Sequence, residues 1–525
     1  MSFTRTVFCL TGLLLGTVFS SPAQMLQPSN PDSALLDIVN HLGGTLLTLD
    51  QARQYSTQTS PAVLAAEAAV AAARGSVRRE GGTFDPQLSL SWRYTDQKQP
   101  TASFFAGASV LHTLQADGGA GLQWTLPSGT MLGASIDASR LNTNSSFAFL
   151  TPQYTTAGQL TLRQPLLRGF TVSARKNLAN AEQQLEAAEA RLTQERLALA
   201  TLVELVYWDL YAGERDYAVQ KLTRDRAAAF LRDTELRAQT GLIGPSQVAN
   251  ARTFLAEQEI LLLDREEQLD RLSDQLAVVV GMRPEAGQTR FKSVEQPPDA
   301  FTVGEVDVLV REALTRNLEL RAAKADLDAR RTMASAASWE ALPSVDLVGS
   351  IGGSGLSGSP HDVIFGNDTL RTTVSGGLSD ALRQAVNRDF PNWHVGLEVL
   401  VPIGFRSGLG ERDRLEAEVT IAEQRYVQEE RILEAEVRSS CRELMHGQQR
   451  LNAARAGVTA AQEQVRIGMI EFQNGRSTAF ELVRLGADFA VAQQRYSQAL
   501  VRSAKSAATL RQLTSGAYDP ALSQQ

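Results

Sequence analysis

Cysteine, histidine and lysine are scarce in this chain, and their scarcity argues against several classes of protein. The 525 residues contain only Cys9 and Cys441, too few for a disulfide-stabilised scaffold. The five histidines are scattered, so no zinc-site spacing occurs, and no cofactor is predicted. Only 6 of the 51 basic residues are lysine, and 58 acidic residues give a net charge of −7. Without a basic excess, nucleic acid is not an expected partner.

The sequence also lacks a run long enough to cross a membrane as a helix, which needs about 18 apolar residues. The apolar run Val7 to Phe19 is shorter, follows Arg5 and precedes the small residues Ser21 and Ala23. This pattern is typical of a secretory signal peptide, which we place at residues 1–23; an uncleaved anchor is the alternative. An exported chain without a spanning helix is periplasmic, extracellular or a β-barrel.

Proline is missing from two long stretches, between Pro165 and Pro245 and between Pro402 and Pro520. Since proline costs about 3 kcal/mol inside a helix, these gaps permit very long helices. Apolar residues recur every seven positions in both stretches, which is typical of helices packed as coiled coils. We therefore predict a helix from about Ser173 to Thr240; ordinary globular helices are the alternative.

Short segments between the helical runs alternate apolar and polar residues, as strands with two unlike faces do. They lie at 87–94, 158–163, 344–348 and 393–399, with glycine- and serine-rich loops predicted at 139–153 and 352–379. A possible amphipathic helix spans 378–387. Strands of this kind in an exported protein favour an outer-membrane barrel, with a soluble sandwich as the competing interpretation.

The sequence reads as an internal duplication. Residues 59–66 align with 316–323, Phe84-Asp85-Pro86 aligns with Ala341-Leu342-Pro343, and Gly241 aligns with Gly475. Each half then has the order helix, strand, loop, strand, long helix, turn, helix. The first half has an additional segment at 119–138, which reads as a hairpin with its turn at Pro127-Ser128-Gly129.

Two turns between the long helices carry a family resemblance. The first runs from Arg237 to Val248 and the second from Asn474 to Leu482, each followed by a heptad helix. With the export signal and the duplication, the chain resembles a TolC-like outer-membrane efflux protein from about residue 49 to 516. The resemblance implies a mainly α fold with membrane β: a long coiled-coil α-helical barrel continuous with a trimeric transmembrane β-barrel, built on an internal two-fold repeat.

The resemblance also implies function and partners. Such a protein is a homotrimer in outer-membrane lipid that extends into the periplasm. It is the passive exit duct of a tripartite efflux pump or type I secretion system, and works with a periplasmic adaptor and an inner-membrane pump or ABC transporter. It is no enzyme and needs no cofactor. The family's four strands per protomer leave the role of the 119–138 hairpin, and hence the strand count, open.

By the same resemblance, the helix turns hold the candidate site. In the family, acidic residues after the second turn narrow the tunnel entrance and bind cations; the first such position is Glu481, and the second falls on Arg484. Arg484 could instead pair with Glu481, and Glu481 could simply be a solvated surface charge. The residues expected to contact the adaptor are those of the two turns: Arg237, Gly241, Leu242, Gly244, Pro245, Ser246, Gly475, Arg476, Ser477 and Thr478. Ser246 is a possible cap of the helix after the first turn.

These expectations divide the chain as follows: signal peptide 1–23; N-terminal segment and first-repeat helix 24–83; first-repeat strands and extracellular loops 84–165, with the extra hairpin 119–138; first-repeat long helices 166–283, with a periplasmic turn at 241–246; linker 284–304; second-repeat helix 305–342; second-repeat strands and extracellular loop 343–402; second-repeat long helices 403–515, with a turn at 474–478; C-terminal tail 516–525.

Two other functions are weighed against a channel. A periplasmic coiled-coil adaptor without a pore is the alternative, but it has one helical hairpin rather than a duplicated pattern. A nucleotide-binding enzyme is suggested by the G-x-G-x-x-G string from Gly353 to Gly358. That site needs a helix immediately afterwards, and Pro360-His361 follows instead, so the string is not taken as a dinucleotide site.

Overall fold

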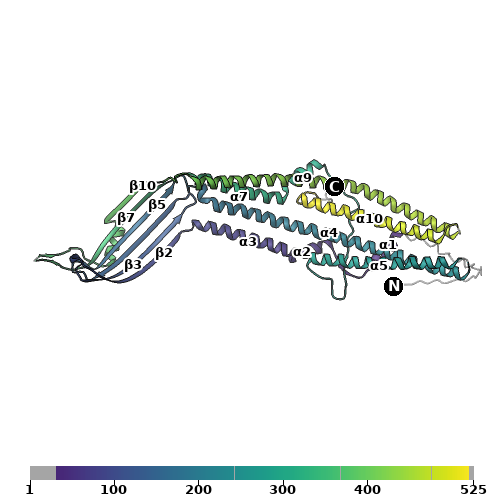
Figure 1. Ribbon diagram of the computed structural model, residues 1–525, viewed down its shortest axis with the longest axis horizontal. Coiled ribbons are helices and arrows are strands. Elements are labelled where there is room, and N and C mark those ends of the chain that lie inside the picture. Colours follow the sequence, from purple (N-terminus) through teal and green to yellow (C-terminus); the bar gives the residue numbers. More distant parts are fainter. Residues whose placement is uncertain (1–30, 242, 367, 475, 519–525) are drawn as a thin grey trace, which may run out of the picture.

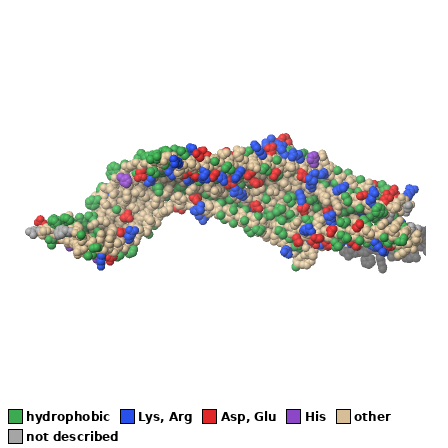
Figure 2. All heavy atoms as spheres, viewed as in Figure 1, with side chains coloured by type: hydrophobic (Ala, Val, Ile, Leu, Met, Phe, Trp, Pro, Cys, Tyr) green, Lys and Arg blue, Asp and Glu red, His purple; other side chains and the backbone are tan. Residues whose placement is uncertain are grey.

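The molecule is elongated, with a β-sheet at one end and long helices over the rest of its length (Figure 1). The structure, a computed structural model, describes residues 31–241, 243–366, 368–474 and 476–518. The predicted signal peptide at 1–23, Leu242, Gly475 and the last part of the C-terminal tail therefore lie outside the described residues. Charged side chains of both signs are spread along the helical part (Figure 2).

The α-helices are α1 (Pro31–Asn40), α2 (Leu49–Thr59), α3 (Pro61–Gly81), α4 (Val172–Gln239), α5 (Pro245–Val280), α6 (Val306–Arg316), α7 (Leu318–Glu340), α8 (Leu378–Asn387), α9 (Arg406–Gln473) and α10 (Ala479–Leu513). The strands are β1 (Thr45–Leu47), β2 (Gln87–Pro100), β3 (Val110–Thr125), β4 (Met131–Thr143), β5 (Leu150–Pro165), β6 (Phe291–Ser293), β7 (Ser344–Pro360), β8 (Val363–Phe365), β9 (Asp368–Leu370) and β10 (Phe390–Leu400). Two short 3-10 helices span Gly82–Phe84 and Phe104–Ala106.

The two longest helices, α4 and α9, have 68 residues each and run from the sheet towards the opposite end (Figure 1). At 1.5 Å per residue each is about 100 Å long. The helix predicted from about Ser173 to Thr240 is thus confirmed by α4. α5 packs antiparallel along α4, and α10 along α9, so the molecule ends in two helical hairpins.

Six strands form one antiparallel sheet in the order β10-β7-β5-β4-β3-β2. The hairpin predicted at 119–138 is part of this sheet, because β3 pairs with β2 on one side and with β4 on the other. Its turn lies where it was expected: Gly129 has a positive φ of 85°, and its N–H donates to the carbonyl of Leu126. The strand count that the sequence left open is six in this sheet.

The predicted loop at 352–379 begins too early. β7 continues to Pro360, and residues 352–360 are paired with β5, and in part with β10. This stretch is rich in glycine and serine, which rarely favour strands, but pairing with β5 along most of it and with β10 at residues 352–354 satisfies many of its backbone groups. The G-x-G-x-x-G string therefore lies within a strand, and no helix follows it directly.

The two faces of the six-stranded sheet differ in polarity. Residues that share one face are mostly apolar and exposed: Leu88, Leu90 and Trp92 (β2), Leu122 and Trp124 (β3), Leu160 and Leu162 (β5), Leu347 and Ile351 (β7), and Trp393, Val395 and Leu397 (β10). The other face carries mostly polar residues: Ser89, Ser91 and Arg93, Gln115 and Asp117, Ser135 and Asp137, Gln159 and Thr161, Asp346 and Ser350, and His394 and Glu398. We call them the apolar and the polar face.

The predicted amphipathic helix is confirmed as α8, and it packs on the apolar face over β7 and β5. Close approach depends on Gly353 and Gly355, since a Cβ atom at either position would overlap the carbonyl oxygens of Ala385 and Ala381 respectively. The Thr156 hydroxyl donates to the Ala381 carbonyl (2.6 Å). Two glycines of the string that resembles a nucleotide-binding motif, Gly353 and Gly355, therefore serve helix-to-sheet packing.

Around the middle of α4, a belt of buried polar residues joins segments that are distant in sequence. Glu204 is only 6% exposed and accepts hydrogen bonds from Arg53 of α2 (2.6 Å) and Arg511 of α10 (3.0 Å). The buried Tyr207 hydroxyl lies 2.5 Å from a carboxylate oxygen of Glu295, which follows β6. These contacts fasten α2, α10 and the β1–β6 pair to α4.

A third buried group of this belt is the Glu214 carboxyl, which is 1% exposed and accepts from the Ser293 N–H (2.7 Å) and hydroxyl (2.5 Å). Burial raises the pKa of Glu214 from 4.5 to about 7, although the bonds from Ser293 and the charge of Lys292 oppose the rise. The folded protein therefore prefers the protonated carboxyl.

This preference predicts a pH-dependent stability. The contribution of Glu214 to the free energy of unfolding is complete below pH 4.5 and is lost as the pH rises through 7, a change of about 3 kcal/mol. Glu214→Gln cannot ionise and keeps an oxygen for the Ser293 N–H, so we expect it to unfold at a higher temperature than the wild type at pH 8 but not at pH 5. Thermal unfolding across this range checks it, with the exposed Glu257→Gln as control. Parallel pH profiles of Glu214→Gln and wild type would contradict this account.

Candidate functional site at the helix turns

The two predicted turns lie together at the end of the molecule farthest from the sheet (Figure 1). Arg237, in the last turn of α4, connects them: its guanidinium lies 4.4 Å from the ring centre of Phe472 in α9 and pairs with Asp233 at 2.9 Å. A cation over an aromatic face is attracted to it, so this contact holds the two hairpin ends side by side. Arg237 is thus a contact within the protomer as well as a predicted surface residue.

The first turn has the backbone that the sequence predicts, with one correction. Gly241 follows the end of α4 and has a φ of 76°, which lies in the left-handed region that glycine favours. Helix α5 begins at Pro245, with Gly244 as its N-cap, so Ser246 lies inside the helix and is not the cap. The fixed φ of proline suits the first helical position, which decides where the helix begins.

In the second turn, Thr478 caps α10: its hydroxyl accepts the N–H of Glu481 (3.2 Å). The Glu481 carboxylate then lies in the first turn of α10, where the helix dipole favours negative charge, and accepts from the Ser477 hydroxyl (3.3 Å). Arg476 donates its backbone N–H to Glu471 and closes the end of α9. The exposed Glu481 side chain is therefore held by local bonds.

Arg484 is exposed one turn further along α10. Among the residues that the structure describes, no ion pair joins it to Glu481. The pairing that the sequence left open is therefore absent from this protomer, and Ser477 takes that place beside the carboxylate.

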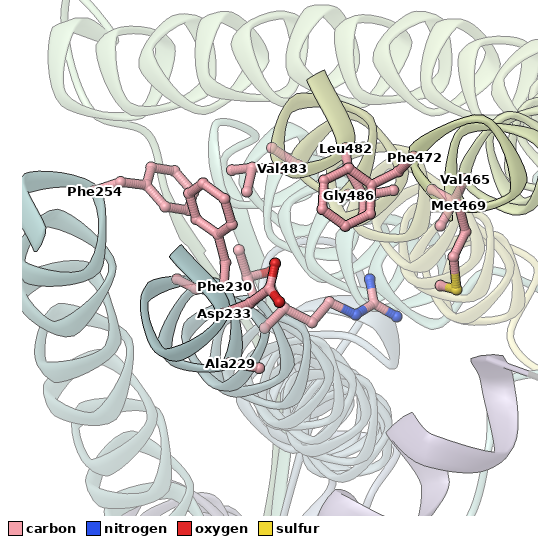
Figure 3. A pocket seen from close by; sticks show the side chains of 14 residues that line it. Ala229, Phe230, Asp233, Phe254, Val465, Met469, Phe472, Leu482, Val483 and Gly486 are labelled. Carbon is pink, nitrogen blue, oxygen red and sulfur yellow. The ribbon is translucent and has the colours of Figure 1, made fainter. Parts of the chain in front are cut away.

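An apolar cavity of about 310 Å³, which was not predicted from the sequence, lies between the two hairpins near the turns. Figure 3 shows Phe230 of α4, Phe472 of α9 and Val483 of α10 lining it from three helices, with Asp233 at its border. A signal was present in the sequence, because the three phenylalanines that line the cavity, at 230, 254 and 472, lie within about 15 residues of the turn glycines. Their convergence depends on the packing of four helices and is not visible in either half alone.

No cluster of three or more histidine, cysteine, aspartate or glutamate side chains in the described parts of the chain is arranged to hold a metal ion. No helix among those residues combines the length and the apolar character needed to cross a membrane.

The comparisons with known proteins agree with one another. Residues 309–516 match the model of a family described as outer membrane efflux protein. The outer membrane protein VceC of Vibrio cholerae has the same fold, with 17% identity over 90% of this chain and 97% of that one and a TM-score of 0.61. The Campylobacter jejuni outer membrane channel CmeC gives 12% identity, 91% and 88% coverage and a TM-score of 0.59. The open state of the Neisseria gonorrhoeae channel MtrE gives 14% identity over 89% of this chain and 89% of that one, with a TM-score of 0.59. No curated protein matches by sequence.

Proposed function

We propose that the chain belongs to the outer membrane efflux proteins, a family of channels rather than enzymes whose model matches residues 309–516, and that it is the exit duct of a tripartite efflux pump or a type I secretion system. It lies in the outer membrane and extends into the periplasm. In this proposal it is a passive, homotrimeric conduit docked by a periplasmic adaptor and driven by an inner-membrane pump or ABC transporter.

The observation that carries the proposal is the sheet with one apolar and one polar face, joined to helices of about 100 Å. A face that exposes Trp92, Leu160 and Trp393 is suited to lipid, and the opposite face is suited to a water-filled lumen. One protomer leaves the edges of β2 and β10 unpaired, and open edges are not tolerated in lipid. Several copies must therefore share one barrel that continues into a helical tunnel.

We also propose the internal duplication and the division of the chain that the sequence suggested. Supporting the duplication, α4 and α9 have equal lengths, and α5 and α10 have 36 and 35 residues. The extra hairpin β3–β4 breaks the symmetry of the halves, which is expected if it was inserted into the first.

At the opposite end, we propose that Glu481 borders the periplasmic aperture, with Arg484 in place of a second acidic ring. The turns, including Gly241, Gly244, Pro245 and Ser477, would contact the adaptor. Three-fold symmetry would bring three Glu481 carboxylates together, and such a ring attracts divalent cations. The bonds from Ser477 and the Thr478 cap support this role because they fix the carboxylate at the turn.

Single-channel recording in planar bilayers tests this function. We expect purified protein to form pores that Mg²⁺ blocks, and Glu481→Gln to weaken that block about tenfold, because the variant loses the charge but keeps the bond from Ser477. The control is Glu259→Gln, an exposed carboxylate of α5. Equal block of Glu481→Gln and wild type at every Mg²⁺ concentration would reject the ring, and the lack of any pore would reject the channel.

A further inference from the structure

We propose that three copies of this chain close a barrel of eighteen strands, in which β10 of each copy pairs with β2 of the next in one of two registers that the faces and lengths of these strands allow. The proposal rests on the proposed function, which supplies the three copies and the lipid. It departs from the four strands per protomer that the family resemblance implied, because the sheet has six.

The two edge strands are suited to pair with each other. Every pairing within the sheet is antiparallel, so the direction of β10 is opposite to that of β2 in a neighbouring copy. The apolar face carries odd-numbered residues on β10, such as Trp393, and even-numbered residues on β2, such as Leu88. A continuous apolar face therefore requires odd residues of β10 to stand opposite even residues of β2, which excludes every second register.

Strand length narrows the choice further. β10 spans Phe390–Leu400 and β2 spans Gln87–Pro100, so only a few registers pair every residue of β10. Two of these also keep the faces aligned. In one, Trp393 stands opposite Tyr94 of the next copy; in the other, it stands opposite Asp96.

These registers can be compared with the path of hydrogen-bonded neighbours through one protomer. Starting at Trp393, that path crosses Ile351, Leu160, Ala134 and Leu122 and arrives at Leu88. Between copies, Trp393 meets a residue six or eight positions further along β2. This displacement along β2, which we call the stagger, is therefore six or eight residues for every six strands.

That stagger sets the strand tilt. With about 3.3 Å per residue and about 4.8 Å between strands, six residues give a tilt of about 35° and eight give about 43°. Closed barrels have strand tilts of about 35–45°. The strand ends and the face pattern, which contain no information about tilt, therefore lead to tilts within this range. The tilt depends only on the stagger per copy, and the number of copies sets the width.

Three copies then give a backbone diameter of about 34–38 Å, against about 24 Å for twelve strands at the same tilts. Barrels of 16–18 strands leave an aqueous channel. The hairpin β3–β4 cannot project away from this wall without breaking its pairing to β2 and β5. Its polar-face residues, among them Asp117 and Asp137, would line the widened exit.

Disulfide trapping tests the register. In a Cys441→Ser background, His394→Cys is combined with Arg93→Cys for the first register or with Thr95→Cys for the second. Directly opposed residues of an antiparallel pair are close enough for a disulfide, so one combination should convert most monomers into covalent trimers on non-reducing gels. His394→Cys with Ser350→Cys is the positive control, since these residues are partners within one protomer. His394→Cys with Trp92→Cys, on opposite faces, is the negative control.

An electron cryomicroscopy map of the same trimers in lipid nanodiscs counts the strands. Eighteen strands with trapping in either register support the proposal. A trimer with twelve strands, or with neither disulfide, overturns it and leaves the proposed channel intact. Two copies sharing twelve strands also overturn it. Failure to find any membrane-embedded oligomer would instead reject the proposed function.

Discussion

Alanine in place of Glu204 is expected to lower the free energy of unfolding by about 3–5 kcal/mol. The carboxylate is buried and is shared by Arg53 and Arg511, whose side chains are themselves only 31% and 29% exposed. Removing it leaves two guanidinium groups near the molecule's core with one strong acceptor fewer, and breaking a buried pair costs far more than losing an exposed one. The indole of Trp208 also loses an acceptor at 3.4 Å.

Chemical denaturation of the purified protein in detergent measures this effect. A matched control is Glu189→Ala on the same helix, because Glu189 also bridges to another helix but its pair with Arg74 is exposed. That change should cost less than about 1 kcal/mol. If both variants unfold at the same denaturant concentration, Glu204 does not stabilise the packing of α2 and α10 against α4.

Valine in place of Gly355 is expected to release α8 from the sheet. The added side chain would occupy the position of the Ala381 carbonyl, and overpacking of this kind costs about 1–3 kcal/mol. A helix of ten residues is not stable alone. We therefore expect α8 to unfold locally once it loses two hydrogen bonds to the sheet, from the Thr156 hydroxyl to the Ala381 carbonyl and from the Leu356 N–H to the Gln384 side chain.

Hydrogen exchange of the amides of residues 378–387 measures this release. We expect their exchange rates to rise about 5- to 150-fold, the factor that corresponds to a cost of about 1–3 kcal/mol. Gly349→Val is the control, because it lies on the same strand and the same face, and its Cβ atom would meet its nearest neighbour at 3.7 Å. Unchanged exchange in Gly355→Val would show that α8 does not depend on the glycine surface.

The long helices could be predicted from the sequence because their signals are local. The absence of proline and the seven-residue repeat located α4 to within one residue at each end. The amphipathic pattern of α8 was equally plain, since ten residues suffice to show it.

Other features could not be predicted because they depend on distant partners. The stretch from 352 to 360 has the composition of a loop, and becomes a strand only because β5 and β10 pair with it and α8 covers it. Ser246 looked like a cap in isolation, but Pro245 sets the start of the helix. Glu204 and Glu214 resemble the solvated charges of any coiled coil until α2, α10 and β6 are placed against them.

The position of the polar belt along α4 has a mechanical consequence. Glu204, Tyr207 and Glu214 lie close to the midpoint of a rod without proline, so the belt is a fulcrum with a lever arm of about 50 Å on either side. A tilt of about 10° around it displaces each end by about 9 Å in opposite directions. Small angular changes at the centre are therefore amplified into large displacements of the turns.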